Sequence, residues 1–145
     1  MPEPWILVTE AALDDAAARR FVAAPSNGAV LVFHGVVRDR HEGRAVTRVE
    51  YSAYEAMAES ELREVARETA REHGVEHLAV FHRLGPVAVG EASLVVAVGA
   101  PHRAAAFACG LATIDRLKAR APVFKKEIGP DGARWQEGVL PEPAP

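Results

Sequence analysis

The segment Asp115-Arg-Leu-Lys-Ala-Arg-Ala-Pro-Val-Phe-Lys-Lys-Glu127 carries five basic residues, in a chain of 145 residues whose formal net charge is −3. It marks a change of structure, because Pro122 disfavours helical backbone in the residue before it and so ends a long apolar helix. The residues after the proline, beginning with Val123 and Phe124, are typical of a strand. Cations grouped at this junction predict a semi-buried pocket for an anion, with one amine available for chemistry.

Lys118 is the candidate amine. On a helix that advances about 100° per residue, one stripe contains Phe107, Leu111, Ile114 and Lys118. This spacing predicts that Lys118 occupies the last position of the core-facing side. Burial and the charges of Lys125 and Lys126 would favour its neutral form, so we expect a lowered pKa and a role as nucleophile or proton acceptor. The alternative is a surface lysine whose methylenes cover the core while its ammonium reaches water.

Length and composition indicate one domain over residues 1–137 and a disordered tail over 138–145. Hydrophobic residues at 49% and charged residues at 26% are typical of a globular protein. The excess of acidic over basic residues argues against a general nucleic-acid binder. We expect a cytoplasmic protein, because Cys109 is the one cysteine and neither a signal peptide nor a membrane-spanning segment is evident.

The remaining elements follow from hydrophobic periodicity and from turn residues. Strands are predicted at 5–9, 29–37, 46–53, 77–84, 92–100, 123–128 and 133–137, and helices at 13–24, 56–73 and 101–119. The nearly all-apolar stretch 29–37 is expected to be a central strand covered on both faces, with 46–53 paired to it. The polar stretch 38–44 between them is expected to be a mobile loop.

A second cationic feature lies at the other end of the last helix. Pro101 is expected in its first turn, where unpaired amides attract anions, and His102 and Arg103 would add positive charge. A phosphate site is one interpretation and a solvated turn is the other. Lys118 lies on the order of 20 Å away along the helix, so one small ligand could meet both only if a second subunit supplied one of them.

Metal binding is not predicted. His73 and His77 are separated by Gly74, which breaks the helix, while His34 and His82 lie in apolar strands and are typical of satisfied core residues. The mid-helix Cys109 suits packing better than catalysis. We therefore expect no metal and no other cofactor.

Several short segments together resemble one family. They are Gly35-Val-Val-Arg38, His82-Arg-Leu-Gly85, Ala100-Pro-His-Arg103, and the run from Leu117 to Glu127 with Trp135 after it. In this order and spacing they resemble the large, catalytic subunit of molybdopterin synthase, over about residues 28–137. This chain has Val123-Phe124 where members of the family often carry two aromatic residues.

The resemblance implies an α+β fold of the hammerhead type, with mixed and antiparallel sheet, two long helices and a C-terminal β-hairpin. It implies a homodimer at the centre of a heterotetramer. A ubiquitin-like small subunit would insert its Gly-Gly tail, which ends in a thiocarboxylate, into each active site. The implied reaction transfers two sulfurs in sequence to cyclic pyranopterin monophosphate, as a step of molybdenum cofactor biosynthesis.

The resemblance also implies roles for individual residues. Lys118 and Lys125 would be the catalytic amines. The substrate-binding set would be Val36, Val37, Arg38, His102, Arg103, Lys126 and Glu127, with the His-Arg pair coming from the neighbouring protomer.

Two other functions remain open on the residues alone. A non-catalytic adaptor would use the same cations to hold the acidic tail of a ubiquitin-like partner, and charge alone would then suffice at Lys118. A small RNA-binding domain is disfavoured by the acidic balance and by only 6% aromatic residues, which are few for base stacking.

Overall fold

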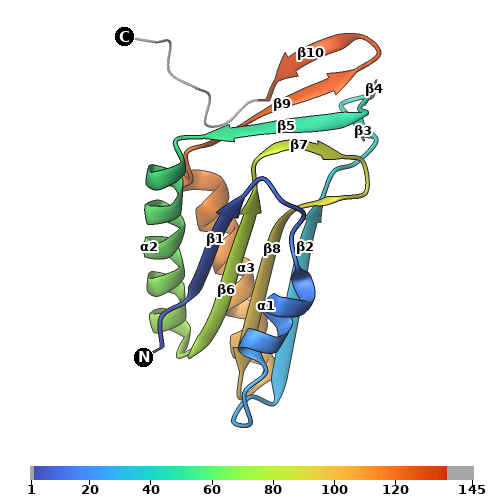
Figure 1. Ribbon diagram of the computed structural model, residues 1–145. Coiled ribbons are helices and arrows are strands. Elements are labelled where there is room, and N and C mark those ends of the chain that lie inside the picture. The colour runs from blue at the N-terminus through green and yellow to red at the C-terminus, as the bar shows by residue number, and fades with distance from the viewer. Residues whose placement is uncertain (1, 137–145) are drawn as a thin grey trace.

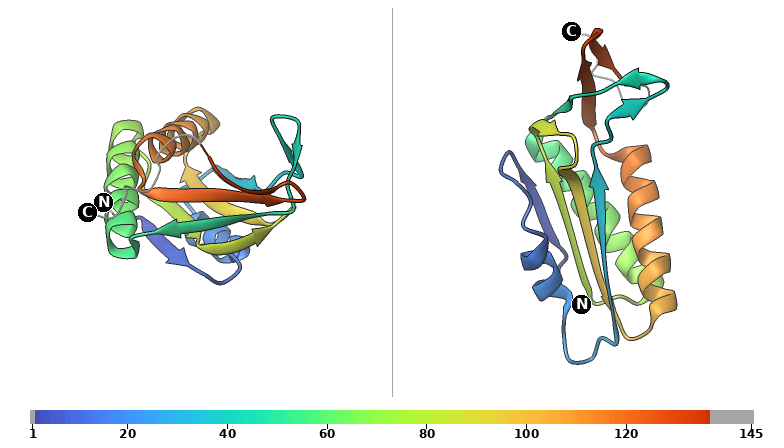
Figure 2. Two further views of the ribbon diagram at one scale, coloured as in Figure 1. Left: turned by 90° about the horizontal axis from the view of Figure 1, so that it is seen from above. Right: turned by 90° about the vertical axis from the view of Figure 1, so that its right-hand side faces the viewer.

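The computed structural model describes residues 2–136, which form two main sheets and three helices. The larger sheet has the strand order β1 (Trp5–Thr9), β6 (His77–Arg83), β8 (Ala92–Ala100) and β2 (Ala29–Val36). One face of this sheet is covered by α1 (Asp15–Val22). The other is covered by α2 (Glu55–His73) and α3 (Arg103–Arg120), as Figures 1 and 2 show.

The second sheet lies across one end of the first (Figure 1). Its strand order is β10 (Gly132–Trp135), β9 (Val123–Gly129), β5 (Arg48–Ala53) and β7 (Gly85–Ala88). Helices packed on one sheet, with a separate antiparallel sheet at its end, confirm the predicted α+β class.

The core has two parts because the central strands β6 and β8 are covered on both faces. Along β8, Val96 and Val98 pack towards α2 and α3, whereas Val95 and Ala97 pack towards α1. The sequence of β8 is therefore apolar at nearly every position instead of alternating, as expected for a strand buried on both sides.

Two predictions about strand pairing are wrong. The stretch 29–37 forms β2, which is an edge strand beside β8, and Val30 and Val36 are exposed. The stretch 46–53 forms β5, which pairs with β7 and β9 in the other sheet and not with β2. The chain between them carries the backbone from one sheet to the other, so adjacency in sequence does not become adjacency in a sheet.

The segment 38–44, expected as a mobile loop, includes the small hairpin of β3 (Arg40–His41) and β4 (Arg44–Ala45). Glu42 and Gly43 form its turn, and both have positive φ, as a two-residue hairpin turn of the I′ type requires. The ring Nδ1 of His41 lies 3.1 Å from the carboxylate of Glu127 on β9, which attaches the hairpin to the second sheet.

The short strand β7 was not predicted. It contains Pro86, which cannot donate to a strand ladder, and β7 accordingly lies at the edge of its sheet. The two long helices are confirmed, with Gly74 in the left-handed conformation after α2. The first helix is shorter than predicted.

Helix α3 begins at Arg103 with His102 as its N-cap, so Pro101 lies before the helix and not in its first turn. The predicted tail at 138–145 and the last residue of the predicted strand 133–137 lie outside the described residues. None of the helices within residues 2–136 combines the length and the apolar character needed to cross a membrane.

Candidate active site

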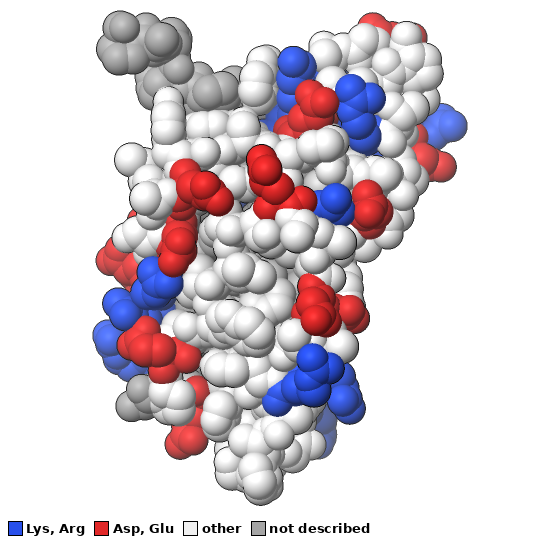
Figure 3. All heavy atoms as spheres, viewed as in Figure 1, with Lys and Arg blue, Asp and Glu red and all other residues white. Residues whose placement is uncertain are grey.

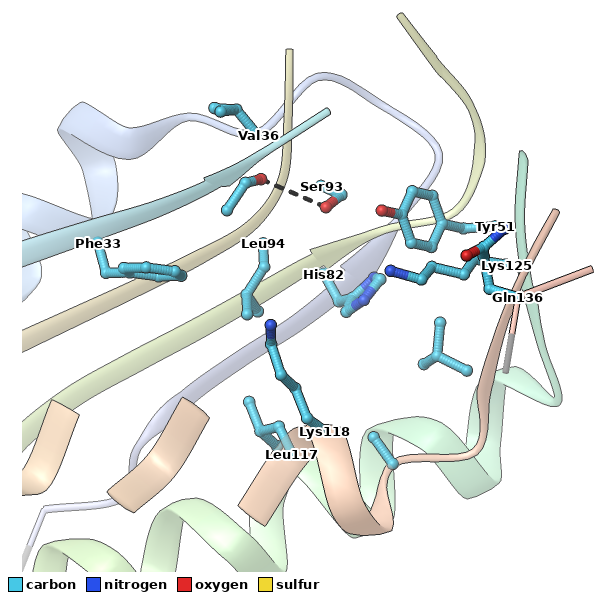
Figure 4. A pocket seen from close by; sticks show the side chains of 13 residues that line it. Phe33, Val36, Tyr51, His82, Ser93, Leu94, Leu117, Lys118, Lys125 and Gln136 are labelled. Carbon is cyan, nitrogen blue, oxygen red and sulfur yellow. Dashed lines mark hydrogen bonds between the residues drawn. The ribbon is translucent and has the colours of Figure 1, made fainter. Parts of the chain in front are cut away.

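A pocket of about 330 Å³ lies where the last turn of α3 meets the junction of the two sheets (Figure 4). Its polar lining consists of Tyr51, His82, Ser93, Lys118, Lys125 and Gln136. Its apolar lining includes Phe33, Leu94 and Leu117. Residues from both sheets and from α3 therefore meet in one cavity.

The orientation of α3 differs from the prediction. Phe107 and Leu111, expected in the core, are each 62% exposed, and the buried face carries Ala106, Cys109, Gly110, Thr113 and Leu117. Small residues on this face allow close packing: a Cβ added at Gly110 would lie 3.2 Å from the side chain of Leu31 on β2. The helix thus packs through its small residues, which size-based pattern analysis does not detect.

Lys118 follows the buried Leu117 and so lies at the boundary between core and solvent. Its side chain is exposed and not semi-buried as predicted, but it extends into the pocket (Figure 4). The last turn of α3 is held against α2 by Arg120, which donates to Glu61 at 2.8 Å and to Glu68 at 2.6 Å. This anchoring fixes the backbone from which Lys118 projects.

Lys125 is the amine whose pKa is lowered. Lys125 is exposed as a whole residue, but its amine end points into the pocket (Figure 4). Burial is the largest cause of the lowered pKa, the positive charge of Lys118 is the second, and Arg38 adds to it, while the carboxylate of Glu127 opposes the shift. The sequence had not predicted a lowered pKa for Lys125.

Lys126 and Glu127 do not line this pocket. Lys126 lies on the opposite face of β9 from Lys125, as strand alternation predicts, and its Nζ is 5.6 Å from the centre of the Trp135 ring. Glu127 shares the face of Lys125. It is the partner of His41 and acts on Lys125 through its charge.

The end of β2 brings three further predicted residues towards the site. A register shift between Gly35 and Val36 bends the strand end, and Val36 lines both the pocket and a second, more open hollow of about 540 Å³. Val37 and Arg38 line this second hollow; Val37 is otherwise buried, and Arg38 is exposed. Arg38 is close enough for its charge to lower the pKa of Lys125.

His102 and Arg103 are not brought to the pocket within this chain. Both are exposed at the start of α3, whereas Lys118 lies in its last turn. At 1.5 Å per residue the separation along the helix is about 24 Å. Figure 2 shows α3 running the length of the larger sheet between these two ends.

The sequence-based site lacked Tyr51, Ser93 and Gln136. Burial is the largest cause of the raised pKa of Tyr51, and its hydroxyl points towards Ser93 (Figure 4). Ser93 Oγ donates to the carbonyl of Gly35 at 3.3 Å. The sequence carried no signal for Ser93 or Gln136.

His82 was interpreted as a satisfied core residue, and it lines the pocket instead. Burial lowers the pKa of His82 to about 4; the hydrogen bond to the carbonyl of Arg83 opposes this lowering, and the charge of Lys125 adds a smaller lowering. Its ring packs edge-on against Tyr51, with 5.4 Å between ring centres. The one indication in the sequence that His82 has a functional role was that it belongs to His82-Arg-Leu-Gly85, one of the segments that carry the family resemblance.

The site therefore combines two amines with neutral hydrogen-bonding groups. Positive charge from Lys118 and Lys125 suits an anionic reactant and would stabilise negative charge that develops during a reaction. The lowered pKa of Lys125 favours proton exchange by this amine closer to neutral pH.

Comparisons with known proteins show which family this chain resembles in sequence and in fold. The family described as MoaE protein matches residues 8–120. The molybdopterin synthase catalytic subunit of Homo sapiens is 43% identical over 117 residues, which cover 81% of this chain and 62% of the human protein. This chain thus spans less than two thirds of the length of that relative.

Solved structures share the fold. The crystal structure of molybdopterin synthase from Staphylococcus aureus superposes with a TM-score of 0.84 at 32% identity, covering 94% of this chain and 98% of that chain. A Helicobacter pylori chain is 22% identical with a TM-score of 0.75, over 93% of this chain and 92% of that one. It comes from a complex of subunits 1 and 2 of molybdopterin-converting factor. From the family match over residues 8–120 and the shared fold, it follows that this chain belongs to the MoaE protein family.

Proposed function

We propose that this chain is the catalytic subunit of a molybdopterin synthase, a sulfurtransferase of molybdenum cofactor biosynthesis. The substrate is cyclic pyranopterin monophosphate, and the sulfur donor is a ubiquitin-like small subunit with a Gly-Gly terminus in thiocarboxylate form. The observation that carries this proposal is the meeting of Lys118 and Lys125 in one pocket. Family membership supplies the reaction class.

The charges of the reactants explain the need for the two amines. A thiocarboxylate and a cyclic phosphate are both anions, and Lys118 and Lys125 would offset their mutual repulsion. Overall, each transfer exchanges the sulfur of the thiocarboxylate for a substrate oxygen, leaving a carboxylate on the small subunit. Two loaded small subunits are therefore consumed for each dithiolene. We assign the catalytic roles to Lys118 and Lys125, because their amines share the cavity.

The anion-binding set requires a second copy of the chain. We propose that Arg38 contributes from the same protomer and that His102 and Arg103 come from the partner in a homodimer, since about 24 Å of helix separates them from Lys118 within one chain. The exposed Phe107 and Leu111 on α3 offer apolar surface for such contact. Small subunits on both protomers would complete a heterotetramer, as the two-subunit complex from Helicobacter pylori suggests.

The other assignments follow from position. Val36, Val37 and Glu127 border the site, and we propose that they shape the substrate pocket. We propose that Lys126 also binds the anionic substrate, from the face of β9 on which it contacts Trp135. We also propose that residues 1–137 act as a single domain and that the protein works in the cytoplasm.

The surface charge offers little support for the RNA-binding alternative. On the face drawn in Figure 3, basic and acidic side chains are interspersed and no broad basic area forms. Electrostatic binding to a nucleic-acid backbone would require such an area.

Reconstitution tests the proposed function. The chain is mixed with a thiocarboxylated small subunit and the pyranopterin precursor, and dithiolene formation is followed for wild type, Lys118→Ala and Lys118→Arg. We expect the rate to fall on the order of a hundredfold to a thousandfold in both variants. If Lys118→Arg retains full activity, or if wild type forms no product, the catalytic assignment is wrong. Tight binding of the small subunit without turnover by wild type would favour the adaptor.

A further inference from the structure

His82 occupies a fixed position inside the pocket. It lies near the end of β6, where its backbone is paired with Val8 of β1 on one side and with Leu94 of β8 on the other. Its ring is held further by the edge contact with Tyr51. The strand pairing fixes the backbone of His82, and the contact with Tyr51 restricts the rotation of its ring.

The hydrogen bond of His82 determines which ring nitrogen carries the proton. Nδ1 lies 2.9 Å from the carbonyl oxygen of Arg83. A carbonyl can only accept, so Nδ1 must donate, and in the neutral imidazole Nε2 is then left as an acceptor. Within residues 2–136, Nε2 has no hydrogen-bond partner, although His82 lines the cavity.

The other polar groups that line the pocket differ from Nε2 of His82 in their hydrogen-bonding chemistry. Lys118 and Lys125 are donors when charged and suit the anionic parts of a ligand. The Ser93 hydroxyl already donates to Gly35. Nε2 of His82 is thus a neutral acceptor in the same pocket as two cationic donors, and Figure 4 shows the ring beside the end of Lys125. A ligand that satisfies all these groups needs an anionic part and, close to it, an N–H or O–H donor.

We propose that His82 is a specificity-determining residue of this site, whose Nε2 accepts a hydrogen bond from a ring N–H or amino group of a pterin-class substrate. The inference rests on the proposed function for the identity of the substrate and deepens it by assigning the recognition of the heterocycle. Lys118 and Lys125 would bind the anionic groups, and His82 would bind the ring.

Protonation would remove this role. An imidazolium has no acceptor nitrogen, so the low pKa of about 4 keeps His82 competent as an acceptor at any physiological pH. The same low value makes His82 a weak base. A role in binding and orientation is therefore favoured over proton abstraction from Lys125.

Direct binding measurements separate the heterocycle from the anion. The full chain is titrated with a phosphate-free pterin and, separately, with a synthetic peptide that ends in Gly-Gly thiocarboxylate. His82→Leu removes the acceptor nitrogen and keeps a side chain of similar size. His82→Gln retains an acceptor oxygen near the position of Nε2. Thermal unfolding at pH 7.5 verifies that both variants fold.

We expect His82→Leu to weaken pterin binding about three- to tenfold, as for the loss of one neutral hydrogen bond. Binding of the peptide should change less than twofold, and His82→Gln should recover most of the pterin affinity. Equal pterin affinity for His82→Leu and wild type would overturn the inference, as would equal losses for Leu and Gln. Sulfur transfer by wild type is measured in parallel, so absent turnover with His82-dependent pterin binding would refute the proposed function alone.

Discussion

Lys118 and Lys125 face one cavity from different elements, and after burial itself the charge of Lys118 is the largest influence lowering the pKa of Lys125. Lys118 comes from the last turn of α3 and Lys125 from β9, with the turn at Pro122 between them. Two cations held in one pocket destabilise each other's charged forms. An incoming anion would relieve this repulsion, so ligand binding and the protonation of Lys125 should be coupled.

The first prediction concerns the pKa of Lys125. Lys118→Met should raise it, because removal of a nearby positive charge favours the ammonium form. Glu127→Gln should lower it further, because the carboxylate of Glu127 now opposes the shift. The measurement is a titration of the lysine side-chain carbons by NMR. Lys118, Lys125 and Lys126 are the only lysines in the sequence, which makes assignment simple.

Arg116→Gln provides the matched control for this titration. It removes a positive charge from the same turn of α3, but Arg116 is paired with Glu68 and Glu72 of α2. We expect the pKa of Lys125 to stay as in wild type. A shift in this control as large as that in Lys118→Met would mean that general surface charge, and not the pocket neighbour, sets the pKa.

The second prediction concerns Lys126, which the structure places on the aromatic ring of Trp135. A cation–π contact at an exposed position is worth about 0.5–1 kcal/mol. Lys126→Met and Trp135→Leu, singly and together, should give a coupling of about this size in the free energy of urea-induced unfolding. Additive effects of the two changes would mean that the contact contributes nothing to stability.

The local signals in the sequence predicted most elements of the fold correctly. Gly74 ends α2 because glycine adopts the left-handed conformation without steric cost, and Pro122 ends α3 because it disfavours helical backbone in the residue before it; both effects are local. Strand pairing was predicted less well, since the partners of β5 are set by contacts with segments far away in the sequence. An apolar stretch such as β2 does not reveal whether it is central or at an edge.

In the candidate site, too, the parts that are local in sequence were predicted and the parts that depend on long-range contacts were not. The basic segment around Lys118 and Lys125 is continuous in sequence, so its pocket could be predicted. Tyr51, His82 and Ser93 come from three separate strands, and each was ambiguous because a polar residue in a strand is usually satisfied locally or exposed. The face of α3 was assigned wrongly because close packing through Gly110 outweighs the size of Phe107.

The third prediction tests the packing between β8 and the end of α1. A Cβ added at Gly99 would lie 2.6 Å from the side-chain nitrogen of Asn27 and closer still to the carbonyl oxygen of Val22. Asn27 itself donates to that carbonyl at 2.9 Å, so backbone and side chain would both have to move. We expect Gly99→Ala to lower the free energy of unfolding by about 2–3 kcal/mol.

Gly74→Ala is the comparison for this change. Its Cβ would meet nothing within 4 Å, so its cost comes only from the left-handed backbone and should be about 1 kcal/mol. Urea unfolding of both variants gives the two values. A smaller loss at Gly99 than at Gly74 would show that β8 and α1 can separate without penalty.

The fourth prediction concerns the pH dependence of stability that His82 causes. Its pKa is about 4 in the folded protein and 6.5 for the ordinary side chain, so the unfolded chain binds more protons between these values. This contribution to stability is fully present above about pH 6.5 and is lost as the pH falls towards 4, amounting to at most about 3 kcal/mol. Urea unfolding at pH 7 and at pH 5 should therefore show a smaller loss for His82→Gln, which cannot titrate, than for wild type. Equal losses in the two proteins would mean that folding leaves the pKa of His82 at its ordinary value, so that the imidazole would be protonated at pH 5 and would lose the acceptor at Nε2 there.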